Sequence, residues 1–160
     1  MGGIFHVAYV VLAGVWFGGL VFTTAVISPA LGSMGWPETE RVAVRSAIGR
    51  QYARVGGVNL LLLVLFAVLD GASGGFGPDL YAEYALLLLI CGLVAAHGAY
   101  FGRRLAKLAG AEQEAGSEQA AALFAERRRS LQRLSLRASR LNLLASAVVL
   151  VLAVGAGTAS

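Results

Sequence analysis

Two histidines are the residues whose type first suggests chemistry. A pair of histidines in a helical bundle is one way to hold haem or a metal ion. His6 lies near the start of the first apolar segment, and His97 lies six residues before Arg103, near the end of the third. Both segments should cross a membrane in the same direction, so the rise along the helices separates the two imidazoles by about 20 Å or more. Shared ligation within one subunit is therefore not expected, and no cofactor is predicted.

His6 taken alone has two interpretations. The simpler one is a residue at the membrane interface. The other is a site on the outer side of the membrane, where acidic residues close to His6 in the expected topology are Asp70, Asp79 and Glu83. Because histidine together with carboxylates suits divalent ions, His6 and Glu83 are the candidate metal ligands.

A second set of polar residues lies near the inner boundary. Asn59, His97 and Asn142 place one amide or imidazole in each of the last three apolar segments, and Tyr100 lies close to His97. Polar side chains inside a membrane usually face the bundle and find partners there. One interpretation is hydrogen bonding between helices. The other is a binding site at the inner end of a solute or ion path.

The usual signatures of enzymes are absent from the sequence. No apolar segment contains a pair of carboxylates, and the chain has no Walker, Rossmann, HExxH or CxxC motif. The single cysteine, Cys91, excludes an internal disulfide framework and a cysteine zinc site. No catalytic residue is predicted, and a protein without enzymatic activity is favoured.

The elements that carry these residues are apolar helices. The 160-residue chain is 58% hydrophobic and 14% charged, whereas about a quarter of the residues of a soluble domain are charged. A single all-α domain over residues 1–160, a four-transmembrane-helix bundle with cytoplasmic helical extensions, is predicted. The expected spans are about 4–30, 55–71, 82–102 and 140–157, with a helical hairpin over about 103–139.

The charges predict the orientation of the bundle. All 13 basic residues lie in the two connections that follow the first and third spans, and the connection after the second span carries only Asp70, Asp79 and Glu83. The positive-inside rule then places both termini outside and the basic loops in the cytoplasm. The expected location is the cell (inner) membrane. Since topology explains the arginines, no nucleic-acid partner is expected.

The first span contains residues suited to helix packing. Gly14 and Gly18 form a small-xxx-small face that lets another helix approach, from the same chain or from a second subunit, and a homo-oligomer is expected. Trp16 should pack within protein or line a cavity. Pro29 should kink or end the span. A second helix should start at Pro37, unless glycines divide it, namely Gly49, Gly56 and Gly57.

Four arginines recur at helical spacing ahead of the last span, namely Arg129, Arg133, Arg137 and Arg140. One interpretation is a solvated face that anchors the helix at the bilayer. The other is binding of anionic lipid headgroups, an anionic substrate or a cytoplasmic partner.

Three runs of sequence resemble a known family. WFGGLVFTTAVISPAL, RSAIGRQYARVGGVNLLLL and LQRLSLRASRLNLLAS are similar to small four-helix membrane proteins related to transmembrane protein 205, a domain of unknown function in bacteria. The resemblance implies importance for Trp16, Gly18, Pro29, Tyr52, Arg54 and Asn142. The family pattern often has a histidine where this chain has Gln132, so no histidine-dependent role is implied there.

A looser likeness exists to two families with a histidine ahead of a tryptophan in the first helix, the copper-resistance D type membrane proteins and the HemJ-type protoporphyrinogen oxidases. His6 and Trp16 are ten residues apart, about 1000° of helical turn, so they lie on different faces. The chain therefore resembles these families less.

Three hypotheses for function follow. The first is small-solute or ion transport, channel-like activity, or an accessory role in transport, with the polar inner residues as the site. The second is a haem- or quinone-linked membrane oxidoreductase that uses His6 or His97 as a ligand. The third is a non-catalytic membrane scaffold whose hairpin binds a cytoplasmic partner.

Overall fold

The fold is known from a computed structural model that describes residues 2–36, 38–74 and 78–158. Every regular element within these ranges is a helix, which confirms the all-α class. Four helical stretches are long and apolar enough to cross a membrane, namely Gly3–Ser33, Ala43–Ser73, Leu80–Gln113 and Glu118–Ala156. The chain is therefore a multi-pass membrane protein.

The first stretch passes through a proline without ending there. It consists of α1 (Gly2–Val21), a π-helical segment η1 (Phe22–Ile27) and α2 (Ser28–Ser33). Pro29 is the second residue after η1, and the helix ends only after Ser33, where Met34 becomes extended. A proline inside a helix lacks a donor and crowds the carbonyl four residues earlier. The wider turns of η1 accommodate this defect, so Pro29 does not terminate the span.

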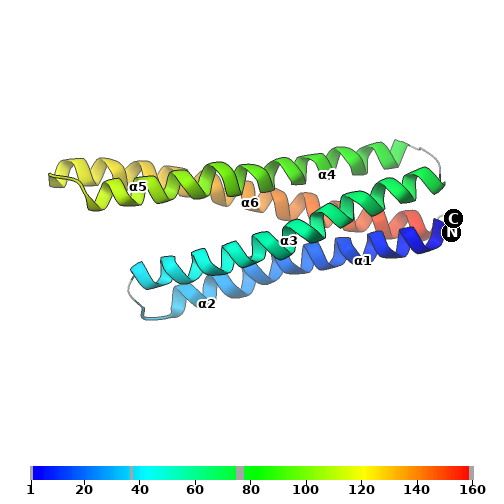
Figure 1. The fold of residues 1–160 in the computed structure, drawn as a ribbon, viewed down its shortest axis with the longest axis horizontal. Coiled ribbons are helices and arrows are strands. Elements are labelled where there is room, and N and C mark those ends of the chain that lie inside the picture. Colours follow the sequence, from blue (N-terminus) through cyan, green and yellow to red (C-terminus); the bar gives the residue numbers. More distant parts are fainter. Residues whose placement is uncertain (1, 37, 75–77, 159–160) are drawn as a thin grey trace. The chain divides into compact units, whose positions relative to one another are not determined.

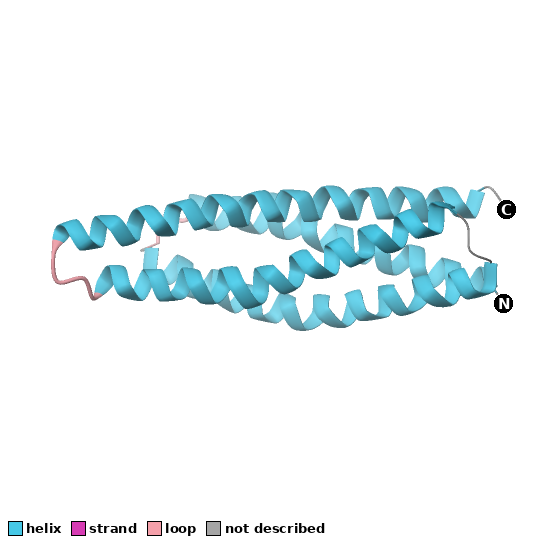
Figure 2. Cartoon of the chain, turned by 90° about the horizontal axis from the view of Figure 1, so that it is seen from above, coloured by secondary structure: helices cyan, strands magenta, loops and turns pink. Residues whose placement is uncertain are grey.

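The second stretch is one uninterrupted helix, α3 (Glu38–Gly74). Three glycines in it, Gly49, Gly56 and Gly57, do not divide it into two helices. The expected start at Pro37 lies outside the described residues. Figures 1 and 2 show α3 returning alongside α1 and α2 after a short connection.

The second half of the chain repeats the pattern of a π-helical segment within a long helical run. It consists of α4 (Pro78–Ala96), η2 (His97–Gly102), α5 (Arg103–Gln113) and α6 (Glu118–Thr158). The turn between α5 and α6 is short. Ser117 caps α6, since its Oγ accepts a hydrogen bond from the Ala120 backbone N–H at 3.3 Å.

Contacts group the chain into two compact units, residues 1–87 with 145–160 and residues 88–144. In the first unit, α1 buries one face through Tyr9, Ala13 and Trp16. The facing residues of α3 are Leu60, Leu63 and Ala67, which recur at spacings of three and four. In α6, Val149 and Ala153 are buried in the same unit. This periodicity is what one buried helix face requires.

Close packing in this unit involves glycines other than the predicted packing pair, Gly14 and Gly18. A Cβ atom at Gly71 would collide with Tyr84 and Leu80, and one at Gly56 would lie 3.3 Å from the Trp16 ring. A Cβ atom at Gly14 or Gly18 would meet nothing within 4 Å among the described residues. Among the described residues of this unit, the small-residue face of α1 therefore makes no close packing contact, and its use between subunits stays a prediction.

We expect Gly71→Val to lower the free energy of unfolding by about 1–3 kcal/mol, because the added methyl groups overpack α3 against α4. Gly18→Val is the matched control and should change it by less than about 0.5 kcal/mol, as for other substitutions at sites without close contacts. Unfolding by dodecyl sulfate in mixed micelles measures both. Equal losses for the two variants would contradict the assignment of the packed face.

The predicted orientation can be tested at two exposed positions. In a Cys91→Ala background, Ala72→Cys lies near the end of α3 and Gly116→Cys lies in the α5–α6 turn. A membrane-impermeant maleimide should label Ala72→Cys in intact cells and label Gly116→Cys only after permeabilisation, because the basic hairpin should be cytoplasmic. The reverse pattern would overturn the orientation.

Candidate functional site

Four polar side chains gather where α1 begins, α3 ends and α4 begins. They are called here the terminal polar cluster, and they are His6, Tyr9, Asp70 and Glu83. His6 and Tyr9 are three residues apart on α1, so they share one face of that helix. α3, which runs antiparallel to α1, brings Asp70 to this face, and α4, which runs parallel to α1, brings Glu83.

Two hydrogen bonds organise the terminal polar cluster. His6 Nδ1 lies 2.9 Å from Asp70 Oδ2, and each of these side chains is 22% exposed. The Tyr9 hydroxyl donates to Glu83 Oε2 at 3.0 Å, and Tyr9 and Glu83 are only 1% and 4% exposed. The cluster thus has a half-buried pair and a fully buried pair.

The two pairs interact electrostatically. Both Asp70 and Glu83 lie close enough to act on the hydroxyls of Tyr9 and Tyr84. Tyr84 donates its own hydrogen bond to the Ala67 carbonyl at 3.1 Å, which ties α4 to α3 beside the cluster. A buried carboxylate in a spanning helix is costly, which makes Glu83 a candidate functional residue.

The chemistry of these groups is exchange of protons or cations. Carboxylates accept a proton or a cation, and an imidazole changes charge near neutral pH. Among the described residues, no group of three or more His, Cys, Asp or Glu side chains has the geometry to hold a metal ion. Asp70, rather than Glu83, is the partner of His6. The side chain of Asp79, the third predicted carboxylate, lies outside the described ones.

A second polar contact lies farther along α1. The Trp16 indole N–H donates to Ser146 Oγ of α6 at 3.0 Å, and both side chains are buried. The Tyr52 ring of α3 lies 6.4 Å from the Trp16 ring and fills the space left by Gly19 and Gly56. Trp16 therefore joins α1 to α3 and α6, as a packing residue.

The predicted inner residues are divided between the two units. Asn59 donates to the Leu12 carbonyl at 3.2 Å, which is a hydrogen bond between α3 and α1. In the other unit, the rings of His97 and Tyr100 lie 5.8 Å and 5.4 Å from that of Phe101. Asn142 is buried in α6. Because no single unit contains all four residues, their common site stays a prediction.

Sequence reasoning missed Tyr9 and Ser146. Tyr9 lies one turn after His6, so the two side chains share one face of the helix. The spacing of these two polar residues could have identified Tyr9 from the sequence. Ser146 is a small hydroxyl residue in an apolar helix, which the sequence does not distinguish from its apolar neighbours. Only the position of α6 beside Trp16 identifies it.

Comparison with known proteins places the chain in a family. The model of a domain of unknown function, DUF4149, matches residues 11–114, more than half of the chain. The chain belongs to the DUF4149 family. No curated protein and no solved structure matches it. The finer likenesses to transmembrane protein 205 and to the copper-resistance D type proteins stay predictions.

The DUF4149 match covers part of each polar site. Asp70 and Glu83 lie within it, as do Trp16 and Tyr52. His6 and Tyr9 precede it, and Ser146 follows it. In this DUF4149 protein, the carboxylates of the terminal polar cluster therefore come from the matched region, and their partners on α1 come from outside it.

A double-mutant cycle tests the buried pair of the cluster. Tyr9→Phe removes the donor, and Glu83→Ala removes the acceptor. We expect a coupling of about 1 kcal/mol in the free energy of unfolding, which is within the range for hydrogen bonds between membrane helices. Strictly additive effects would mean that the Tyr9 hydroxyl does not stabilise Glu83.

Proposed function

We propose that this DUF4149 protein moves protons or small cations across the cell membrane, with the terminal polar cluster as its binding site. The observation that supports the proposal is Glu83, a carboxylate that is 4% exposed at the beginning of an apolar spanning helix and accepts a hydrogen bond from Tyr9. Ionisable groups in such positions mark proton and ion pathways.

The two halves of the cluster suit different steps of transport. The pair of His6 and Asp70 is half-buried, so it can exchange protons or cations with water. Glu83 is closed off from solvent, and in an apolar site it must be neutralised by a proton, a cation or a hydrogen-bond donor. The hydroxyl of Tyr9 lowers the cost of the ionised state, which allows Glu83 to bind and release its ion.

The proposal includes an orientation. With the basic connections in the cytoplasm, the terminal polar cluster opens to the outside. The predicted inner residues His97, Asn59, Asn142 and Tyr100 are then the candidates for the inner end of the path. Three alternative functions stay predictions, namely an accessory role in transport, a haem- or quinone-linked oxidoreductase and a scaffold. The homo-oligomer also stays a prediction.

Flux into proteoliposomes tests the function. The purified protein is reconstituted with a trapped pH indicator, and a potassium diffusion potential drives protons inward. A second set of vesicles, with a trapped fluorescent chelator, reports entry of divalent cations. We expect Glu83→Gln to lower whichever of these two fluxes the wild-type protein shows at least tenfold, since the variant loses its ionisable group at the buried position.

A matched control removes a charge elsewhere. Glu114 is an exposed carboxylate in the α5–α6 turn, and Glu114→Gln should leave the flux within about twofold, as expected for a charge screened by solvent. If neither protons nor divalent cations enter faster than in protein-free vesicles, or if Glu83→Gln and wild type transport equally, the proposal fails.

A further inference from the structure

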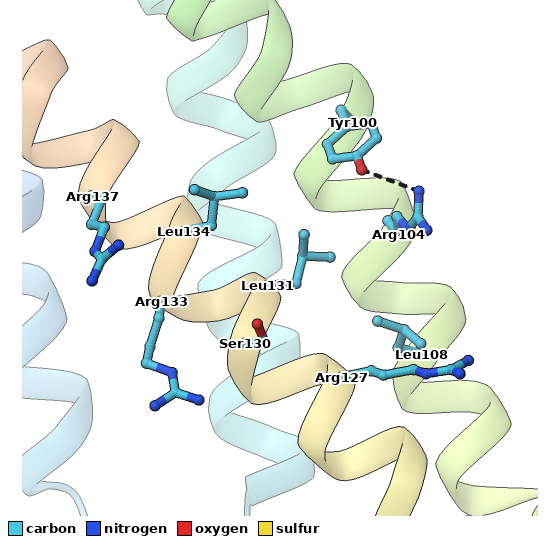
Figure 3. A pocket seen from close by; sticks show the side chains of 9 residues that line it. All are labelled: Tyr100, Arg104, Leu108, Arg127, Ser130, Leu131, Arg133, Leu134 and Arg137. Atoms are coloured by element: carbon cyan, nitrogen blue, oxygen red, sulfur yellow. Dashed lines mark hydrogen bonds between the residues drawn. The ribbon is translucent and has the colours of Figure 1, made fainter.

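A basic groove runs between the helices of the second unit. It has a volume of about 690 Å³ and is lined by residues of η2, α5 and α6. Four arginines line it, namely Arg104, Arg127, Arg133 and Arg137. Figure 3 shows Arg127 reaching from α6 toward Leu108, and Arg133 and Arg137 extending from the other edge of α6.

The charge of this groove is not neutralised by neighbouring carboxylates. The last acidic residue of the sequence is Glu126, and six arginines follow it. The nearby ion pair joins Arg128 to Glu112 at 2.7 Å, and neither of these residues lines the groove. Within the part of the chain that the structure describes, no carboxylate forms a salt bridge with the four lining arginines.

The groove also offers neutral donors and an apolar lining. The Tyr100 hydroxyl accepts a hydrogen bond from Arg104 at 3.1 Å, and the Arg104 guanidinium lies 5.4 Å from the centre of the Tyr100 ring. Ser130 and three leucines complete the lining. One of these, Leu134, is 52% exposed among the arginines. A cationic site beside an exposed leucine suits a ligand with an anionic head and an apolar tail.

We propose that this groove binds the phosphate headgroup of an anionic phospholipid. Guanidinium groups recognise phosphate oxygens in a bidentate manner, so the arginines on either edge of the groove can hold the oxygens of a headgroup. The groove lies where apolar helix ends and arginines begin, with Tyr100 at the level that aromatic residues occupy at membrane interfaces.

Only some of the arginines singled out in the sequence line the groove. Of the four predicted headgroup ligands, Arg133 and Arg137 line the groove, whereas Arg129 and Arg140 do not. Arg104 and Arg127 replace them. The site is therefore built from two helices of the hairpin rather than from one helical face, and this difference supplies a control with the same loss of charge.

Native mass spectrometry of the full chain tests the proposal. The protein is extracted from vesicles of equal parts phosphatidylglycerol and phosphatidylcholine, and the retained lipids are counted. We expect phosphatidylglycerol to be enriched, and Arg133→Gln with Arg137→Gln to reduce the enrichment about tenfold, since each arginine near an anionic headgroup contributes several-fold. Arg129→Gln with Arg140→Gln removes the same charge outside the groove and should leave the enrichment within about twofold.

A second variant keeps the test independent of folding. Ser130→Glu places a carboxylate among the intact arginines at an exposed position, and it should reduce the enrichment as strongly. The proposal is overturned if both arginine pairs have equal effects, or if Ser130→Glu retains as much phosphatidylglycerol as wild type. It is also overturned if inorganic phosphate, titrated into protein held in phosphatidylcholine, binds with the same arginine dependence while phosphatidylglycerol is not enriched.

Discussion

Polar side chains in this chain must find partners within protein, because hydrocarbon supplies none. The pairs of Tyr9 with Glu83 and of Trp16 with Ser146 meet this constraint at two positions along α1. Each pair joins elements that are far apart in the sequence. These bonds restrict which helix faces can meet, so the same constraint that stabilises the unit also buries the Glu83 carboxylate.

The constraint also explains the wide helical turns. A helix that crosses a membrane cannot be broken to relieve a local clash, since freed backbone groups would lack partners. The proline of the first stretch is therefore preceded by a π-helical segment rather than by a loop. A second segment of this kind includes His97 and the Tyr100 that lines the basic groove.

Two polar regions of opposite charge result. The terminal polar cluster concentrates carboxylates in the unit of residues 1–87 and 145–160, and the groove concentrates guanidinium groups in the unit of residues 88–144. Buried carboxylates suit protons and cations, and clustered arginines suit phosphate. The first region is proposed to carry ions, and the second to hold the lipid that surrounds the protein.

The sequence by itself determined the helical class and the four apolar stretches, and it grouped His6 with three carboxylates, Asp70, Asp79 and Glu83. These follow from hydropathy, length and charge, which act locally along the chain. Only the tertiary structure decided that Asp70 pairs with His6, that Tyr9 and Ser146 take part, and that Gly71 rather than Gly18 permits close packing. The reason is that lipid-facing and helix-facing apolar residues look alike in sequence, so the rotation of each helix about its axis is set by contacts with its neighbours.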